Sequence, residues 1–306
     1  MRSWLLCCSV VVSLAVGVPQ RAVGQVLYDN FNAANRLIDI NKWGGFETEW
    51  RGTEANRRID AGKLRLTARG AGLLAATPTG RILSYFGLYH PNPNPVTLWQ
   101  ATVEVVDFDA IACPTQTTSS EAWAILQGNF FNSGTPIPGT FTNEVFAHIA
   151  LVRRSNATVD TVAVEAAMLR CTNASCSPPH GNRQDFPMGI LTCPGRICPP
   201  VTLRITWEEA ANRFRFLRGA VGALPALERI ANYTLSDANR GRPSRTLSVV
   251  PGPATCTTAA GRKTAFMDVL FDNVTANVVN VGTTSAGGLD AVDLGEALGP
   301  GEMPVP

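Results

Sequence analysis

Short stretches in which apolar and polar residues alternate dominate the chain, and long stretches with the spacing of an amphipathic helix are absent. In residues 63–69, leucine and alanine at even positions alternate with lysine, arginine and threonine at odd ones. In residues 99–105 the odd positions are apolar and the even positions are polar. This period of two is typical of strands with one buried face. We therefore predict an all-β protein.

Two segments predict β-hairpins. In residues 57–69, the sequence Asp60-Ala61-Gly62 separates two strands, and Gly62 occupies a turn position that requires a positive φ. In residues 201–219, two alternating runs are separated by a short polar loop. The apolar residues that these two runs would place on one buried face are Leu203, Ile205, Trp207, Phe214 and Phe216.

Three neighbouring segments are predicted from different signals. Residues 144–154 are apolar on both faces, which is typical of a central strand covered on both sides, and we expect His148 within it to be buried. Residues 160–170 favour a strand over a short helix. Residues 172–200 are rich in cysteine and proline and predict an irregular insertion that is held by disulfides.

One short sequence occurs twice, as VLYDNFNA at residues 26–33 and as VLFDNVTA at residues 269–276. The flanking residues share nothing, so the pair is not a sign of duplication. Two terminal strands that meet in one sheet explain it better. We predict that residues 26–31 pair antiparallel with part of residues 266–278.

The two ends of the chain differ from its middle. Residues 1–24 have a basic residue, an apolar run and small residues before a predicted cleavage after Gly24, as in a signal peptide. Residues 25–282 would form one domain, and the acidic residues 283–306 are predicted to be a disordered tail. These features indicate a secreted, periplasmic or cell-surface protein, and no later apolar run suggests a transmembrane segment.

Charge and cysteine content narrow the class further. The whole chain has 26 basic and 24 acidic residues, and both counts become equal once residues 1–24 are removed, which argues against nucleic acid as a partner. Six cysteines remain, and an even number in an exported chain indicates disulfides more than a zinc site. The simplest pairs are Cys171–Cys176, Cys193–Cys198 and Cys113–Cys256, and other pairings stay open.

In the order of these segments, the chain resembles a secreted bacterial protein of the concanavalin A-like lectin/glucanase superfamily. The resemblance rests on the opening VLYDNFN, the KW at residues 42–43, RRIDAGKLRL, RITWEEAANRFRF and the closing MDVLFDNVTAN, and it covers most of residues 26–282. It implies a jelly-roll sandwich in which two antiparallel sheets stack and the first and last strands are adjacent.

The resemblance also implies where catalytic carboxylates would lie. Family-16 glycoside hydrolases of this superfamily carry the motif E-x-D-x-x-E on one strand, and the nearest match here is EVVDFD. Asp107 and Asp109 would share one face, but Glu104 is an odd number of residues away and is expected on the opposite face. The triad is therefore absent, and these three residues are weak catalytic candidates in a chain that is predicted not to be an enzyme.

Aromatic residues in predicted loops are the candidates for sugar binding, because exposed rings stack on sugars. Trp43 and Trp50 flank GGFETE, with Arg51 beside them, and Tyr85 and Tyr89 precede a proline-rich loop.

A structural calcium ion is the one cofactor that the resemblance suggests, near the first and last strands. Asp29, Asn30, Asp272 and Asn273 offer the oxygen ligands that calcium prefers. The alternative is that each Asp-Asn pair occupies solvent-facing strand positions or a β-bulge.

Three functions fit these features. The first is an exported, non-catalytic binding or interaction module, with polysaccharide as the most plausible partner. The second is a divergent polysaccharide hydrolase or lyase. The third is a structural protein of the cell envelope or surface. Fold class alone does not choose among them.

Overall fold

The computed structural model of the protein describes residues 25–33, 37–47, 52–72, 81, 83–91, 96–113, 118–176, 179–222, 227–232, 244–256 and 263–277. Nearly all regular structure in this part of the chain is β-strand, with two single-turn 3-10 helices, η1 (Pro194–Arg196) and η2 (Glu209–Ala211). The prediction of an all-β fold is confirmed.

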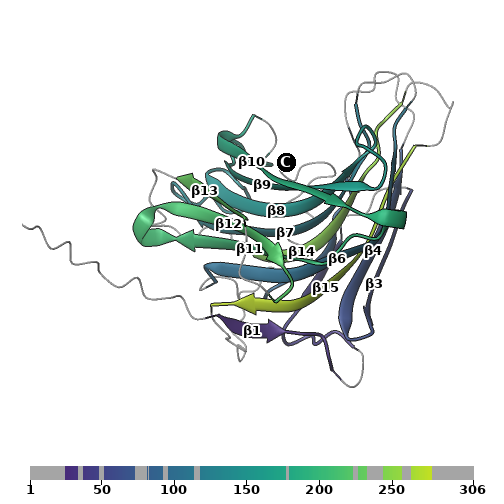
Figure 1. Ribbon diagram of the computed structural model, residues 1–306. Coiled ribbons are helices and arrows are strands. Elements are labelled where there is room, and N and C mark those ends of the chain that lie inside the picture. The colour runs from purple at the N-terminus through teal and green to yellow at the C-terminus, as the bar shows by residue number, and fades with distance from the viewer. Residues whose placement is uncertain are drawn as a thin grey trace, which may run out of the picture.

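The strands form two antiparallel sheets that stack as a jelly-roll sandwich, and Figure 1 shows their long strands curving together. The eight-stranded sheet has the order β13 (Leu227–Asn232), β12 (Arg213–Ala220), β11 (Val201–Glu208), β6 (Leu98–Ile111), β15 (Thr264–Ala276), β4 (Lys63–Ala71) and β3 (Thr53–Asp60), and β1 (Val26–Asp29) also pairs with β15. The seven-stranded sheet has the order β10 (Gly181–Thr192), β9 (Thr161–Arg170), β8 (Glu144–Arg154), β7 (Glu121–Asn132), β14 (Ser244–Gly252), β5 (Phe86–Tyr89) and β2 (Gly44–Glu47).

The main hydrophobic core lies between the two sheets. It is formed by the inward-facing residues of alternating strands, and the hairpin residues named above are all buried in it. The hairpin between β3 and β4 turns at Gly62, whose φ of 76° is the positive value that the sequence predicted. Residues 144–154 form β8, and residues 160–170 contain β9, as predicted. Every residue of β8 except Arg154 is buried.

The first and last strands are adjacent, as predicted. Val26 pairs with Ala276 and Leu27 with Thr275, and a bulge then brings Asp29 opposite Val274. The strand β4 pairs with the earlier part of β15, so β4 and β1 lie end to end along one edge of it. Figure 1 shows β1 beside the end of β15.

The prediction that residues 172–200 form an irregular insertion is wrong. This segment contains the twelve-residue strand β10, which pairs with β9 at the edge of the seven-stranded sheet. Its alternation is obscured because an edge strand faces solvent on much of its length, and because its pairing is interrupted between Pro187 and Ile190, where Gly189 has a φ of 96°.

Three disulfides join the six cysteines in the described residues, and their pairs are the ones that the sequence favoured. Cys113–Cys256 links positions 143 residues apart in the chain. Cys171–Cys176 closes a loop just before β10, and Cys193–Cys198 closes a loop just after it. The edge strand β10 is therefore anchored at both ends. Within the described ranges, no helix has the length and apolar character needed to span a membrane.

Candidate functional site

Trp43 is not the exposed platform that the sequence suggested. It is 3% exposed and packs between the sheets against Tyr28, Phe31 and Trp99. Its indole Nε1 donates a hydrogen bond of 2.7 Å to Asp29, so the ring is oriented inward by a buried carboxylate. Because no sugar can stack on a ring in the core, this part of the prediction is wrong.

The other predicted ligand residues have different outcomes. Trp50 and Arg51 lie outside the described residues. Tyr85 is buried in a second apolar cluster, so its prediction as a groove-lining residue is also wrong. Tyr89 is half-buried at the edge of the same cluster, and its ring lies so close to Gly44 that any larger residue there would overlap it.

The carboxylates of β6 lie on the sheet face that points away from the core. A bulge opposite Asp268 and Val269 adds one residue to β6 and reverses the alternation. Glu104 and Asp107 therefore share the outer face, and the expectation of opposite faces is wrong. Lys63 binds Glu104 at 2.7 Å, and Arg196 binds Asp107 at 3.0 Å. Asp109 lies half-buried farther along the same face.

The four residues suggested for calcium do not fit that ion in this arrangement. Asp29 accepts the backbone N–H of Phe31 with Oδ1 and the Trp43 indole N–H with Oδ2, and the Lys42 ammonium lies 3.9 Å from Oδ1. Asp272 accepts both the backbone and the side-chain N–H groups of Asn273, whose φ of 47° marks a bulge. Asn30 accepts the backbone N–H of Asn32. These oxygens serve as hydrogen-bond acceptors for nitrogen donors, as in the bulge alternative.

Metal ligation is not indicated elsewhere in the described residues. No group of three or more His, Cys, Asp or Glu side chains in that part of the chain is arranged to hold a metal ion.

The seven-stranded sheet has a second side chain layer on the face that points away from the core, which we call the outer face. Its apolar part includes Trp123 and Ile125 of β7, Ala150 and Val152 of β8, and Val250 of β14. On the inner face of the same strands, the residues in between join the main core. The sequence pattern of β7 and β8 is continuous rather than alternating because both faces of these strands are buried.

Two polar atoms on the outer face have no hydrogen-bond partner among the described residues. They are Nε1 of Trp123, which is 1% exposed, and Nε2 of His148, which is 3% exposed. Buried polar groups in proteins nearly always have a partner in the protein or in ordered water, and both atoms belong to side chains that are almost fully buried. The backbone partner of His148 across the strands is Gln127, which shares this face.

His148 is a neutral imidazole. Burial, with a smaller contribution from the nearby Arg183, lowers its pKa to about 4, and Asp185 and Glu165 act in the opposite direction. A neutral imidazole has one nitrogen that donates and one that accepts.

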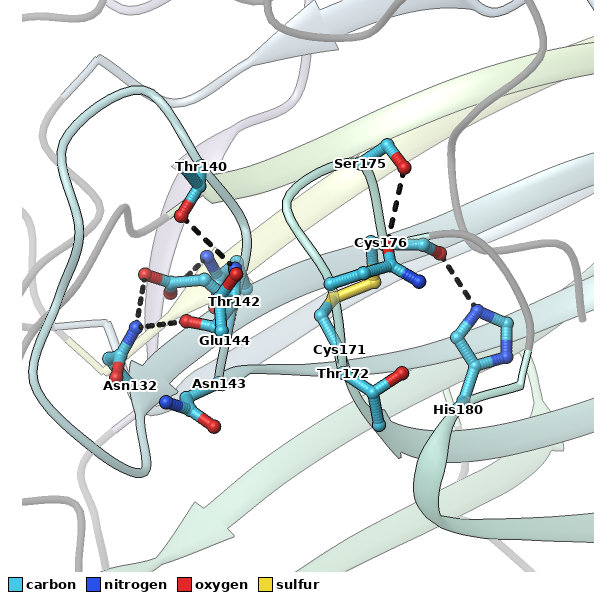
Figure 2. Close-up of a disulfide and its surroundings, with 12 residues drawn as sticks. Asn132, Thr140, Thr142, Asn143, Glu144, Cys171, Thr172, Ser175, Cys176 and His180 are labelled. Carbon is cyan, nitrogen blue, oxygen red and sulfur yellow. Dashed lines mark hydrogen bonds between the residues drawn. A yellow bond between two sulfur atoms is a disulfide. The ribbon is translucent and has the colours of Figure 1, made fainter.

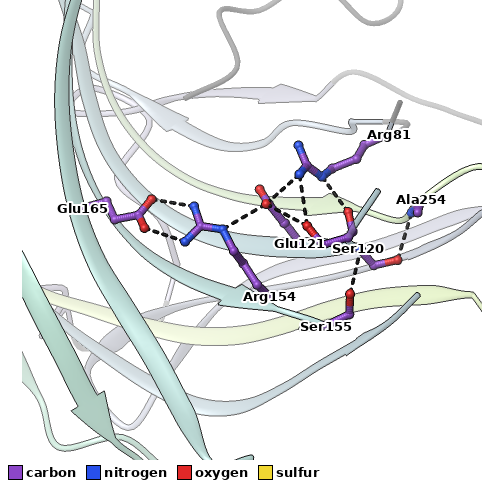
Figure 3. A network of polar contacts seen from close by, with 8 residues as sticks. Arg81, Ser120, Glu121, Arg154, Ser155, Glu165 and Ala254 are labelled. Carbon is purple, nitrogen blue, oxygen red and sulfur yellow. Dashed lines mark hydrogen bonds and ion pairs between the residues drawn. The ribbon is translucent and has the colours of Figure 1, made fainter. Parts of the chain in front are cut away.

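Charged residues at the rim of the outer face are paired with one another. Arg154 of β8 binds both oxygens of Glu165 of β9 and donates to Glu121 of β7 at 3.0 Å (Figure 3). Arg81 also binds Glu121, at 2.7 Å. Burial lowers the pKa of Arg81, whereas the bonds to Glu165 and Glu121 raise the pKa of Arg154.

A second ion pair lies on the edge strand. Arg183 and Asp185 of β10 form a two-pronged contact at 2.8 and 2.7 Å. The rim thus carries equal numbers of positive and negative side chains in its described residues, and each is paired.

Two loops bound the end of the outer face that lies beyond His148. The backbone N–H of Phe141 donates to Ala174, and that of Asn143 donates to Cys171. Buried Glu144 accepts hydrogen bonds from the side-chain amides of Asn129 and Asn132, and Figure 2 shows this carboxylate beside the Cys171–Cys176 loop. The disulfide and the carboxylate together fix the position of both loops.

Sequence reasoning missed this site for a definite reason. His148 was expected in the core, and it is buried, but on the outer face rather than between the sheets. Trp123 carries no local signal because every residue of its strand is buried. Only the register of β7 and β8 brings the two residues to one face.

Comparisons with known proteins give no family. No family model matches the sequence, and no curated protein matches it either.

Solved structures with a similar arrangement have very different sequences. A glycoside hydrolase family protein from Mycobacterium thermorestibile is 15% identical, with 82% of this chain and 99% of that chain covered and a TM-score of 0.39. A lectin from Bauhinia forficata in complex with GalNAc is 8% identical, with 83% and 99% covered and a TM-score of 0.31. A galectin-like protein of unknown function from Bacillus subtilis is 13% identical, with 80% and 94% covered and a TM-score of 0.27. Similarity at this level establishes no function, and the fold assignment rests on the strand order.

Proposed function

We propose that the protein is an exported, non-catalytic module that binds polysaccharide. The observation that carries this proposal is the jelly-roll sandwich with adjacent first and last strands, which is the fold that the resemblance to concanavalin A-like lectins implies. Its described carboxylates Glu104, Asp107, Glu121 and Glu165 are engaged in ion pairs, which supports binding over catalysis.

The described carboxylates do not favour a hydrolase. Glycoside hydrolysis needs one carboxyl that can donate a proton and another that can attack or activate water. Glu121 and Glu165 are both bound to Arg154, and Glu104 and Asp107 each have a cationic partner. These side chains are engaged in ion pairs, which supports a binding role.

Export is part of the proposal. It rests on the predicted signal peptide in residues 1–24 and on three disulfides, which persist in oxidising compartments.

A glycan array followed by affinity gel electrophoresis tests the function. We expect retention of at least one polysaccharide by the wild-type protein. Absence of retention of every glycan by the folded wild-type protein would contradict the proposed function.

A further inference from the structure

The side chain of Gln25, which directly precedes β1, is bound by the guanidinium group of Arg204 on β11. Gln25 is exposed, and Arg204 is half-buried. Because a guanidinium group has only donors, the amide oxygen of Gln25 is the atom that faces it, and this oxygen accepts from Nη1 and Nη2, both at 2.7 Å. One carbonyl oxygen therefore receives two charge-assisted hydrogen bonds.

Arg204 is held in place by its neighbours. Its Nε donates to the side-chain oxygen of Gln100 at 2.7 Å, and Gln100 is its partner on the adjacent strand β6. Burial, with a smaller contribution from Arg215, lowers the pKa of Arg204. Glu208 of the same strand is bound by Arg213 and Arg215 instead. The place beside Arg204 therefore suits a neutral oxygen acceptor and disfavours a second cation.

The predicted cleavage after Gly24 makes Gln25 the first residue of the exported chain. The α-amino group that cleavage frees belongs to the same residue whose amide Arg204 binds. At neutral pH most α-amino groups are cations. A guanidinium group nearby disfavours that cation and favours the neutral amine, which is the nucleophilic form.

We propose that the N-terminal Gln25 of the exported chain is a modification site, where the residue cyclises to pyroglutamate while Arg204 binds the reacting amide. The neutral α-amine attacks Cδ, and the two N–H groups of Arg204 stabilise the negative charge that develops on Oε1. The new bond between the α-nitrogen and Cδ closes a lactam ring, and the bond between Cδ and Nε2 breaks. A proton moves from the attacking nitrogen to Nε2, which leaves as ammonia. This inference rests on the export in the proposed function and not on polysaccharide binding.

The product fits this place better than a free terminus does. The lactam keeps the oxygen that Arg204 binds, and it has no positive charge. Gln25 continues directly into β1, where Leu27 is opposite Thr275 of β15. Thr275 is opposite Gln100, the residue that holds Arg204. Cyclisation thus fastens the start of the first strand to the sheet and leaves no α-amine for an aminopeptidase.

Mass spectrometry measures the reaction. The chain of residues 25–306 is released from an N-terminal fusion by a protease that leaves Gln25 as the first residue, and its mass is followed at neutral pH. We expect the mass to fall by that of one ammonia molecule, at least about tenfold faster than for a peptide of residues 25–33. The peptide has the same terminus and lacks Arg204.

Two variants test the part that Arg204 plays. Arg204→Gln should slow the cyclisation at least about tenfold, towards the rate of the peptide. Arg213→Gln is the matched control, because Arg213 is bound to Glu208, and it should leave the rate unchanged. Circular dichroism shows whether each variant folds, and the comparison of wild-type protein with peptide decides the case if Arg204→Gln does not.

Mass spectrometry of the full-length chain after export separates the outcomes. We expect its first residue to be pyroglutamate at position 25. A chain that starts elsewhere, or equal rates in the folded wild-type protein and the peptide, would overturn the inference and leave the polysaccharide proposal standing. A blank glycan array with a cyclised terminus would contradict polysaccharide binding and support the inference.

Discussion

Asp29 and Trp43, which are 14 residues apart in the chain, are joined by a buried hydrogen bond of 2.7 Å between the carboxylate Oδ2 and the indole Nε1. The same carboxylate accepts the backbone N–H of Phe31 with its other oxygen. One acidic side chain therefore fixes the chain direction after β1 and the orientation of a core tryptophan.

We predict that Asp29→Asn lowers the free energy of unfolding by about 1–3 kcal/mol, because an amide can present an oxygen to only one of the two N–H donors. Urea denaturation followed by tryptophan fluorescence measures the change. Asn30→Ala is the matched control, since Asn30 caps an exposed turn, and it should cost less than about 1 kcal/mol. Equal effects of both substitutions would contradict the role given to Asp29.

The long-range disulfide should stabilise the fold more than a local one. Cys113–Cys256 spans 143 residues, whereas Cys171–Cys176 spans 5. In the chain-entropy description, removing the longer link by substituting both cysteines with alanine costs about 2–3 kcal/mol more than removing the shorter one. Chemical denaturation of the two double variants checks this difference, and a larger loss for the local pair would show that loop entropy does not dominate here.

The carboxylates that flank Arg154 should contribute unequally. The side chain of Glu121 is 5% exposed, and it lies between two arginines, whereas that of Glu165 is 30% exposed. Glu121→Gln removes the carboxylate that binds Arg81 and one of the two carboxylates that bind Arg154, in a buried place, and we expect a loss of about 3 kcal/mol. Glu165→Gln should cost about 1 kcal/mol or less. Thermal or urea unfolding at low salt measures the loss of stability in each variant and shows which of the two losses is larger.

The histidines should make stability depend on pH above the range in which carboxylates titrate. Burial lowers the pKa of His148 and of His90 from 6.5 to about 4. Because the unfolded chain binds more protons between these values, stability is complete above pH 6.5 and falls as the pH drops towards 4. Each histidine contributes about 1.4 kcal/mol per pH unit at most within this window.

Two measurements check the histidine prediction. Urea denaturation between pH 7 and 4.5 should show the loss, and His148→Gln should reduce its slope. In NMR spectra of the folded protein, the imidazole signals of His90 and His148 should not titrate until the pH approaches 4. Titration of either ring near 6.5 would refute the assignment.

Alternation in the sequence was sufficient for the fold class, the hairpins and the pairing of the terminal strands. It failed where the backbone departs from a period of two. One extra residue in β6 moves Asp107 to the face of Glu104, and the pairing that reveals this bulge involves β15, more than 150 residues later in the chain. Local pattern contains no information on such a register shift.

The candidate site was less accessible to sequence reasoning than the fold. A tryptophan beside a glycine-rich loop, such as Trp43, has the same local pattern whether it is a binding platform or a core residue. Trp123 and His148 lie in strands that are buried on both faces, so their common face follows only from the register of β7 and β8. The edge strand β10 was missed because it has few inward positions.

The pairing of Val26 with Ala276 brings the start of the first strand next to the end of the last one. The strand order of the sandwich therefore does not depend on where the chain is opened. A circular permutant that joins these two points by a short linker, with new termini at the exposed β8–β9 turn around Asn156, keeps every strand pair described above. In such a chain, β8 and β9 would be the terminal strands, and the sheet face that carries Trp123 and His148 would be assembled from the two ends of the polypeptide.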